Sequence, residues 1–249
     1  MPAGAVVTTA WLASRDVSAD QARKLAGGGW LQRVGHGAYS RAGDSLSWES
    51  AVFALQAIGN SGLPRFWPGG LTALGLQGLS HYLPIGQEKL HLFGSGTARP
   101  PHWLMDSDWV GPVEFHVDKD LGADIKDSFV HYAPPGKAFG LQVSAPERAI
   151  LEWIAVTPNE LLFSSVLVDT FNGLNTLRPG LLQAMLESCG SVRTKRVFLL
   201  LARHAGHAWN SRLDRQRLDL GSGKRQLCPG GRLDREFQIT VPTEFLHGA

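Results

Sequence analysis

The chain has 249 residues, of which 43% are hydrophobic and 18% charged, and its formal net charge is +2. This length can bury a sizeable core and leaves room for about two domains. The two cysteines, Cys189 and Cys228, are too few for a disulfide framework. No signal-peptide pattern opens the chain, and no apolar run approaches the ~20 residues needed to span a bilayer, so we expect a soluble cytoplasmic protein without a membrane partner.

Charge is distributed unevenly along the chain although the total is small. Residues 1–42, 43–186, 187–235 and 236–249 carry net charges of +3, −6, +7 and −2. Two basic segments therefore flank an acidic middle, as expected if nucleic acid meets the ends of the chain. A solvated surface with chance segregation of charge is the alternative.

The first predicted elements are two short helices. Thr8 or Thr9 can cap a helix that continues through Trp11-Leu12-Ala13. Ser18 followed three residues later by Gln21 is a capping box, which predicts that a second helix opens there. Gly27-Gly28-Gly29 would end that helix, because glycine adopts left-handed backbone angles at little cost.

A β-hairpin is predicted directly after these glycines. Residues 30–34 and 38–41 are two β segments around Gly35-His36-Gly37, which is the pattern of a wing. Two helices and a wing are the parts of a winged helix-turn-helix, in which the second helix enters the major groove and the wing contacts phosphates. We expect Trp11 and Trp30 in its core.

The predicted DNA-contacting side chains come from the second helix and the wing. They are Ser18, Gln21, Arg23 and Lys24 in the helix, and Arg33, His36 and Arg41 in the wing. The same residues could instead form an ordinary solvated helix face and a wet hairpin.

The remainder of the chain predicts a mixed α/β domain. We expect helices at 48–57, 69–79, 144–153, 161–171, 179–187 and 194–204, and strands at 90–93, 113–117, 129–132, 225–227 and 237–241. Ser144, with Pro146 and Glu147 after it, is predicted to cap the helix that follows. The expected fold class is α/β (α+β): a winged helix-turn-helix with closing helices in residues 1–83, then an α/β domain in residues 84–249.

Basic residues gather again between positions 193 and 225. We predict a surface that engages nucleic acid or an acidic partner, formed by Arg193, Lys195, Arg196, Arg203, Arg212, Arg215, Arg217, Lys224 and Arg225. A solvated helix face followed by a basic turn is the alternative.

Enzyme interpretations were tested against their motifs. The run Gly221-Ser222-Gly223-Lys224-Arg225 lacks the first glycine of a phosphate-binding loop and a Ser or Thr after the lysine, so we interpret it as a basic turn. The aspartates at 118, 120 and 124 lack the glutamate that completes a calcium loop.

His204 and His207 have the i, i+3 spacing of metal ligands on a helix, but the sequence offers no evident third ligand. We therefore expect no catalytic residue, metal ion or cofactor. A metal-dependent enzyme acting on nucleic acid through these histidines is kept as the alternative function.

Several short motifs occur in an order typical of one protein family. They are Gly29-Trp30-Leu31 with Gly35-His36-Gly37-Ala38-Tyr39, Gly70-Leu71-Thr72-Ala73-Leu74 with His81-Tyr82-Leu83, Ser144-Ala145-Pro146-Glu147-Arg148-Ala149, and Gly221-Ser222-Gly223-Lys224-Arg225 with Gly230-Gly231-Arg232-Leu233-Asp234. Through these motifs, which extend over nearly the whole chain, the sequence resembles the AbiEi antitoxins of type IV toxin–antitoxin systems, which are also transcriptional regulators.

The resemblance implies an N-terminal domain that binds inverted repeats in double-stranded operator DNA and represses its own operon. It implies a C-terminal domain with antitoxin activity, for which the basic residues between 193 and 225 are the candidate surface. The implied functional partner is a nucleotidyltransferase-like toxin, opposed without a stable complex; direct binding of the toxin is the alternative. The resemblance also implies a further helix ahead of Val6, for which residues 1–5 leave no room, so we expect an upstream start or a minimal DNA-binding domain.

Overall fold

The computed structural model describes residues 1–57, 63–80, 89–122 and 124–246. The chain forms two compact units, each assembled from separate stretches of sequence. The first contains Met1–Pro68, Pro84–Val117 and Val130–Val143, and the second contains Gly69–Leu83, Asp118–Phe129 and Ser144–Ala249. The predicted domain boundary between residues 83 and 84 lies outside the described residues, as does the His81-Tyr82-Leu83 motif.

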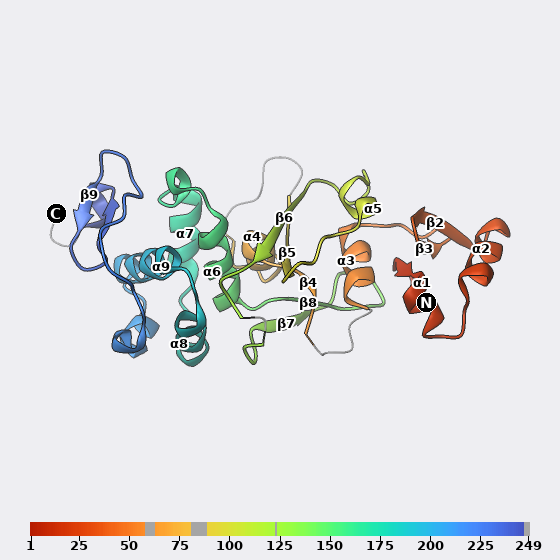
Figure 1. Cartoon of the computed structure of the whole chain (residues 1–249), viewed down its shortest axis with the longest axis horizontal. Coiled ribbons are helices and arrows are strands. Elements are labelled where there is room, and N and C mark those ends of the chain that lie inside the picture. Colours follow the sequence, from red (N-terminus) through yellow and green to blue (C-terminus); the bar gives the residue numbers. More distant parts are fainter. Residues whose placement is uncertain (58–62, 81–88, 123, 247–249) are drawn as a thin grey trace. The chain divides into compact units, whose positions relative to one another are not determined.

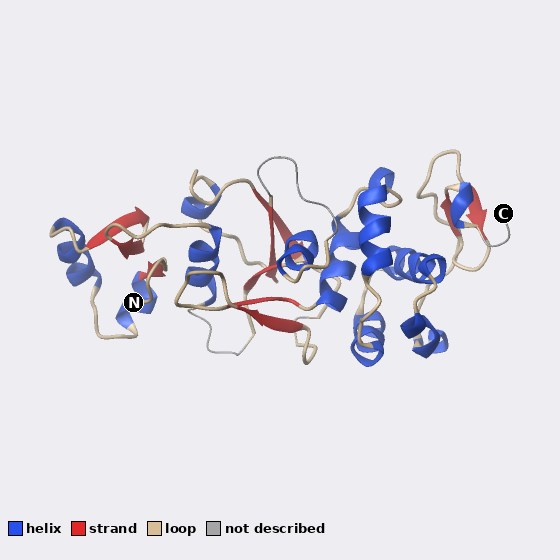
Figure 2. Cartoon of the chain, turned by 180° about the vertical axis from the view of Figure 1, so that it is seen from behind, coloured by secondary structure: helices blue, strands red, loops and turns tan. Residues whose placement is uncertain are grey.

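Helices and strands are mixed throughout the described chain, as Figures 1 and 2 show, and the predicted α/β class is confirmed. No helix in the described ranges is long and apolar enough to cross a membrane.

The first unit opens with the predicted order of two helices and a hairpin. Its elements are β1 (Val7–Thr8), α1 (Thr9–Ala13), α2 (Ala19–Gly27), β2 (Leu31–Gly35) and β3 (Ala38–Arg41). The strands form an antiparallel sheet in the order β1-β3-β2. Thr8 caps α1 by accepting a hydrogen bond from the Trp11 amide, and the capping box predicted at the start of α2 is present.

Two glycines shape the hairpin for steric reasons. Gly37 has φ +69°, a left-handed conformation that favours glycine in the turn between β2 and β3. A Cβ atom on Gly35 would lie 2.3 Å from the Cβ of Trp103, which belongs to α5 (His102–Met105). The Trp103 side chain therefore packs directly on the backbone of β2. A β-bulge between Arg33 and Gly35 interrupts the register of the hairpin at the same place.

The small core of the winged region contains the buried residues Val7, Trp11, Leu12, Ala22 and Tyr39. The prediction that Trp11 belongs to this core is confirmed. The corresponding prediction for Trp30 is wrong, because 75% of that residue is exposed. Trp30 follows the glycine run that ends α2, so it is not part of the helix face that packs against the core.

The rest of the first unit contains α3 (Trp48–Gln56) and the strands β4 (Phe66–Pro68), β5 (Leu90–Ser95) and β6 (Val113–Asp118), which form a sheet in the order β4-β5-β6. A second sheet pairs β7 (Phe129–Tyr132) with β8 (Leu141–Ser144). Gln56 joins distant segments, because its amide donates to the carbonyls of Phe66 and Gln142 and accepts from the Gln142 amide, each within 2.9 Å.

The second unit is mainly helical. Its elements are α4 (Gly70–Leu76), α6 (Pro146–Val156), α7 (Ser165–Gly173), α8 (Pro179–Ser188), α9 (Val192–Ala205), short 3-10 helices at Asn159–Leu161, Ala208–Arg212, Arg215–Arg217 and Thr243–Phe245, and the antiparallel pair β9 (Arg232–Asp234) and β10 (Ile239–Val241). The strand predicted at 225–227 is reduced to an isolated bridge between Arg225 and Ile239.

Helix α6 lies at the centre of this unit, and its residues from Glu147 to Ile154 are all buried. The predicted serine cap of this helix is wrong. The N-cap residue is Ala145, and the hydroxyl of Ser144 instead donates to Glu152 Oε2 over 2.7 Å. The buried carboxylate of Glu152 needs hydrogen-bond donors, so this tertiary contact overrides the local motif.

Candidate nucleic-acid interface

The predicted DNA-contacting residues of α2 all lie on its exposed surface. Ser18 Oγ accepts from the Gln21 amide over 3.2 Å, and Gln21 Oε1 accepts from the Ser18 amide over 2.7 Å. The capping box therefore fixes both side chains at the start of the helix. It uses the oxygen of the Gln21 amide group, so the NH₂ group is the part that can reach a base edge.

Arg23 and Lys24 supply the positive charge of α2. Arg23 pairs with Asp20 one turn earlier, and both side chains are more than two-thirds exposed. An exposed pair of this kind contributes little to stability, so the guanidinium can exchange Asp20 for a phosphate or a base edge at small cost.

The predicted wing residues are also exposed: Arg33 on β2, His36 in the turn and Arg41 on β3. Arg33 Nε donates to the Gly35 carbonyl over 3.3 Å, and Arg41 donates to the Met1 carbonyl. Trp30, at the junction of α2 and β2, adds an exposed indole ring to the same part of the chain.

The second predicted basic surface is divided between the interior and the solvent. Lys195 and Arg196 are buried in α9. Arg196 donates to the carbonyls of Leu220 and Gly223, both over 2.8 Å, and thereby fastens the basic turn to the helix. Arg193 donates over 2.9 Å to the Ile154 carbonyl, close to the end of α6.

Arg203 is nearly buried as well, and it pairs with Asp234 and Glu236 while lying over the ring of Phe237. Burial would raise the pKa of Asp234, but the hydrogen bond and positive charge of Arg203, together with the hydrogen bonds from the Phe237 and Glu236 amides, hold that pKa below its ordinary value. Arg193, Arg196 and Arg203 therefore hold the second unit together, and Lys195 is buried in the same helix.

The other members of the predicted surface remain accessible: Arg212, Arg215, Arg217, Lys224 and Arg225. Arg217 pairs with Glu187 of α8 over 2.8 Å, and Arg215 pairs with Glu236. The accessible part of the cluster thus follows the 3-10 helices and the turn that leads to β9.

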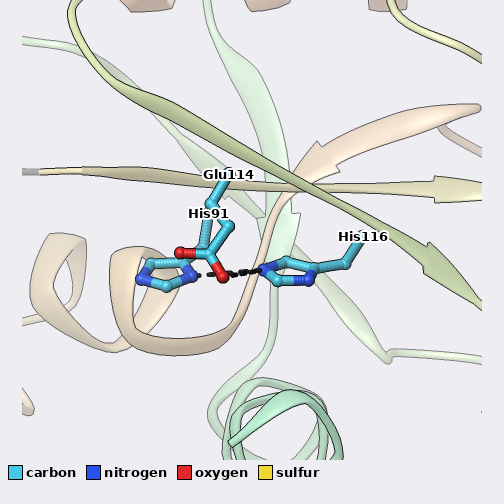
Figure 3. Close-up of side chains that lie close together, drawn as sticks. All are labelled: His91, Glu114 and His116. Carbon is cyan, nitrogen blue, oxygen red and sulfur yellow. Dashed lines mark hydrogen bonds and ion pairs between the residues drawn. The ribbon is translucent and has the colours of Figure 1, made fainter.

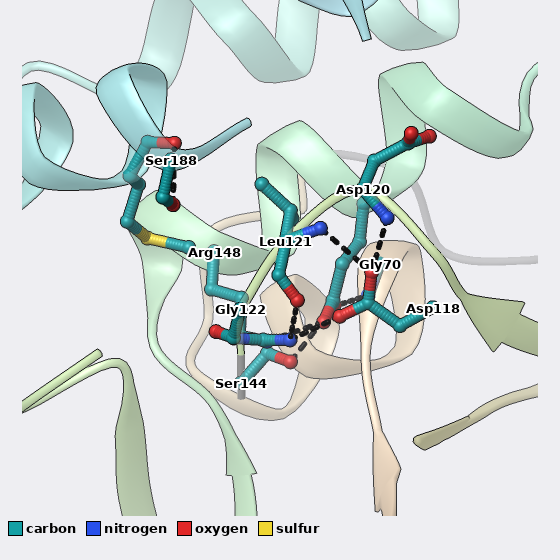
Figure 4. Close-up of polar contacts among 10 residues, drawn as sticks. Gly70, Asp118, Asp120, Leu121, Gly122, Ser144, Arg148 and Ser188 are labelled. Atoms are coloured by element: carbon teal, nitrogen blue, oxygen red, sulfur yellow. Dashed lines mark hydrogen bonds and ion pairs between the residues drawn. The ribbon is translucent and has the colours of Figure 1, made fainter. Parts of the chain in front are cut away.

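A buried polar network surrounds Arg148, as Figure 4 shows. Its guanidinium donates to Glu152 Oε1 over 2.8 Å and to the Gly122 carbonyl over 2.9 Å, and it pairs with Asp118. The second oxygen of Glu152 accepts from Ser144 and from the Gly70 amide. The motif from Ser144 to Ala149 is therefore explained by packing of α4 and of the loop after β6 against α6.

Glu147 of the same motif is also buried and accepts from Arg178 Nη2 over 2.8 Å. Burial opposes its ionisation, but the hydrogen bonds from Arg178 hold the pKa of Glu147 below its ordinary value. Neither carboxylate of α6 is exposed to a ligand in solution.

The structure separates the two histidines of the enzyme alternative. His204 is exposed and packs on Phe245, with ring centroids 4.4 Å apart. His207 Nε2 lies 2.8 Å from the Phe171 carbonyl, and its ring stacks on Trp209. The two histidines do not share a helical face, because α9 ends at Ala205 and Gly206 adopts a left-handed conformation before His207.

A different group of possible metal ligands lies in the first unit. His91 on β5 and His116 on β6 approach each other with 3.4 Å between Nδ1 and Nε2, and Glu114 Oε1 lies 3.7 Å from His116 Nε2 (Figure 3). Burial lowers the pKa of both imidazoles, although the charge of Glu114 opposes this shift. The sequence signal for this group was the His and Glu alternation on two predicted strands.

Comparison with known proteins identifies matches over almost the whole chain. A family described as "Transcriptional regulator, AbiEi antitoxin N-terminal domain" matches residues 1–85, and one described as "Transcriptional regulator, AbiEi antitoxin, Type IV TA system" matches residues 87–242. No curated protein sequence gives a significant match. Among solved structures, the RV2827C protein from Mycobacterium tuberculosis is similar in fold, with a TM-score of 0.59 and 16% identity over 97% of this chain and 88% of the other.

Proposed function

We propose that this chain, which belongs to the AbiEi family of transcriptional regulators and antitoxins of type IV toxin–antitoxin systems, represses its own operon by binding operator DNA through α2 and the wing. The observation that supports this most is the exposure of every predicted DNA-contacting side chain. Residues 1–42, which contain all of them, carry a net charge of +3.

In the proposed complex, α2 enters the major groove of an inverted-repeat half-site. Arg23 exchanges its pair with Asp20, and Lys24 its contact with solvent, for phosphates or base edges. Gln21 presents its NH₂ group to a base. Arg33, His36 and Arg41 contact the phosphate backbone beside the groove.

The experiment is a fluorescence-anisotropy titration of a promoter fragment at several salt concentrations. Arg23→Ala combined with Lys24→Ala should weaken binding several-fold and reduce the slope of log affinity against log salt by about 2. Lys119→Ala combined with Lys126→Ala, which removes the same charge from exposed positions in the acidic middle, should leave binding unchanged. Equal effects of the two double variants would overturn the proposal.

We further propose that the chain opposes a nucleotidyltransferase-like toxin without a stable complex, through the accessible part of the second basic cluster. Arg212, Arg215 and Lys224 are exposed or half-exposed, so changing them to glutamate alters the surface charge while leaving the core in place. Lys195 is excluded from this surface because it is buried, and Arg193, Arg196 and Arg203 are excluded because they hold the interior together.

Growth of cells that express the toxin measures this second activity. The triple variant Arg212→Glu, Arg215→Glu and Lys224→Glu should lose protection, whereas Arg99→Glu, Lys119→Glu and Lys126→Glu should retain it. Full protection by the first variant would contradict the proposed surface. Copurification of the toxin in a stable complex would favour direct binding instead.

A further inference from the structure

We propose that His91, Glu114 and His116 form a binding site for a divalent transition-metal ion, and that the ion is Zn²⁺. This site is independent of the proposed DNA and antitoxin surfaces, because its residues lie on β5 and β6 and belong to neither. Each of these three residues offers one possible ligand atom, and these atoms all lie within 4.8 Å of one another. In the described part of the chain, this is the group of His, Cys, Asp or Glu side chains that meets this condition.

The distances match the coordination geometry of zinc. Zinc binds histidine nitrogen at about 2.0–2.1 Å with tetrahedral angles, which places two ligand nitrogens about 3.3 Å apart. His91 Nδ1 and His116 Nε2 are 3.4 Å apart. Glu114 Oε1 is 3.7 Å from His116 Nε2, so a small rotation of the carboxylate brings it to the same ion.

The backbone supports the site before any ion binds. Glu114 and His116 are two residues apart on β6, where alternation places their side chains on one face of the strand. His91 reaches them from β5, the neighbouring strand of the sheet. Figure 3 shows the three side chains directed toward one another. Ligands on paired strands lose little conformational freedom on binding.

The surroundings fit three protein ligands and one exchangeable position. The His116 side chain is 14% exposed and the Glu114 side chain 43% exposed, so solvent reaches the carboxylate side of the group. Lys89 Nζ donates to Glu114 Oε2 over 3.0 Å, which leaves Oε1 on the side of His116 and fixes the carboxylate as an outer-shell partner does. Phe93 packs on His116, with ring centroids 4.9 Å apart, and shields the other side.

Two imidazoles and one carboxylate favour an ion of intermediate softness. This donor set disfavours Ca²⁺ and Mg²⁺, because these ions prefer oxygen ligands. It also contains no thiolate, the ligand that would favour Cu(I). Two histidines, one glutamate and a water are a common donor set for zinc. The competing interpretation is that the two imidazoles share an ordinary hydrogen bond next to the Lys89–Glu114 pair.

The test uses the full chain, stripped with a chelator and then titrated with Co²⁺, whose visible absorption reports tetrahedral coordination, and with Zn²⁺ in competition. We expect one ion per chain and displacement of Co²⁺ by Zn²⁺. His91→Gln, Glu114→Gln and His116→Gln should each reduce affinity at least about tenfold.

His204→Gln combined with His207→Gln is the matched control, because it removes two histidines outside the site. This control should bind the ions as the unchanged chain does. Absence of tetrahedral Co²⁺ absorption in the unchanged chain would overturn the proposal, whatever the variants do. So would ion binding that survives His116→Gln but is lost in the control.

Discussion

The two basic segments of this chain use their positive charge in opposite ways. In residues 1–42 every predicted cationic contact residue is exposed, and the guanidinium of Arg23 pairs with the carboxylate of Asp20, which is itself exposed. In residues 187–235 the arginines of α9 donate to backbone carbonyls and buried carboxylates. The net charge of a segment therefore does not measure the charge that it exposes to solvent. Arginine side chains can also serve inside a fold as hydrogen-bond donors to backbone carbonyls and carboxylates.

The strongest test of this contrast compares Arg196→Ala with Arg23→Ala in urea denaturation. Arg196→Ala truncates a buried side chain, removes the donor to the Leu220 and Gly223 carbonyls, and should cost about 2–4 kcal/mol of unfolding free energy. Arg23→Ala should change it by less than about 0.5 kcal/mol. Similar losses in both variants would mean that the two basic segments do not differ in their role.

An intermediate effect is expected at the Arg203–Asp234 pair, through pH. The folded pKa of Asp234 lies below its ordinary value of 3.8, so its contribution to stability is present above that value and is lost as pH falls through the folded pKa. Asp234→Asn removes this contribution.

Urea denaturation at neutral pH and at a pH well below 3.8 measures the difference. The unchanged chain should lose more stability between the two conditions than the Asp234→Asn variant. Glu244→Gln, at an exposed carboxylate near the same end of the chain, should keep the pH dependence of the unchanged chain. An equal loss in the Asp234→Asn variant would show that the pair does not couple folding to protonation.

The smallest effect is expected at Trp30. Its residue is 75% exposed, so Trp30→Ala should change unfolding free energy by less than about 0.5 kcal/mol. Trp11→Ala, at a buried ring of the same domain, should cost about 3–5 kcal/mol and serves as the comparison. A large loss at Trp30 would place this ring in contact with another part of the molecule.

Much of the winged region could be predicted because its signals are local. The capping box of Ser18 and Gln21 and the glycine turn at Gly37 each depend on neighbouring residues, and both are present. The exposure of Trp30 could not be predicted in this way. A tryptophan between a glycine run and a strand has no periodic pattern that assigns it to a face.

The remaining differences arise from contacts between residues far apart in sequence. Ser144 has the local signature of a cap, but Glu152 recruits its hydroxyl. Arg196 is of a residue type that is usually exposed, but here it donates to backbone carbonyls 24 and 27 positions later in the chain. His91 and His116 are separated by 25 positions, and only the pairing of strands in one sheet brings them together.

The packing of Trp103 on Gly35 has a consequence for the order in which the chain is made. The wing contains residues 31–41, yet the ring that covers its backbone is synthesised more than sixty positions later. The hydrogen bond from Gln56 to Gln142 likewise forms only after the later residue has been synthesised. The same holds for the packing of Phe53 on Phe139, whose ring centroids lie 4.7 Å apart. During translation the helix-turn-helix therefore emerges well before its support, and the first unit can reach its final packing only after Val143 has left the ribosome.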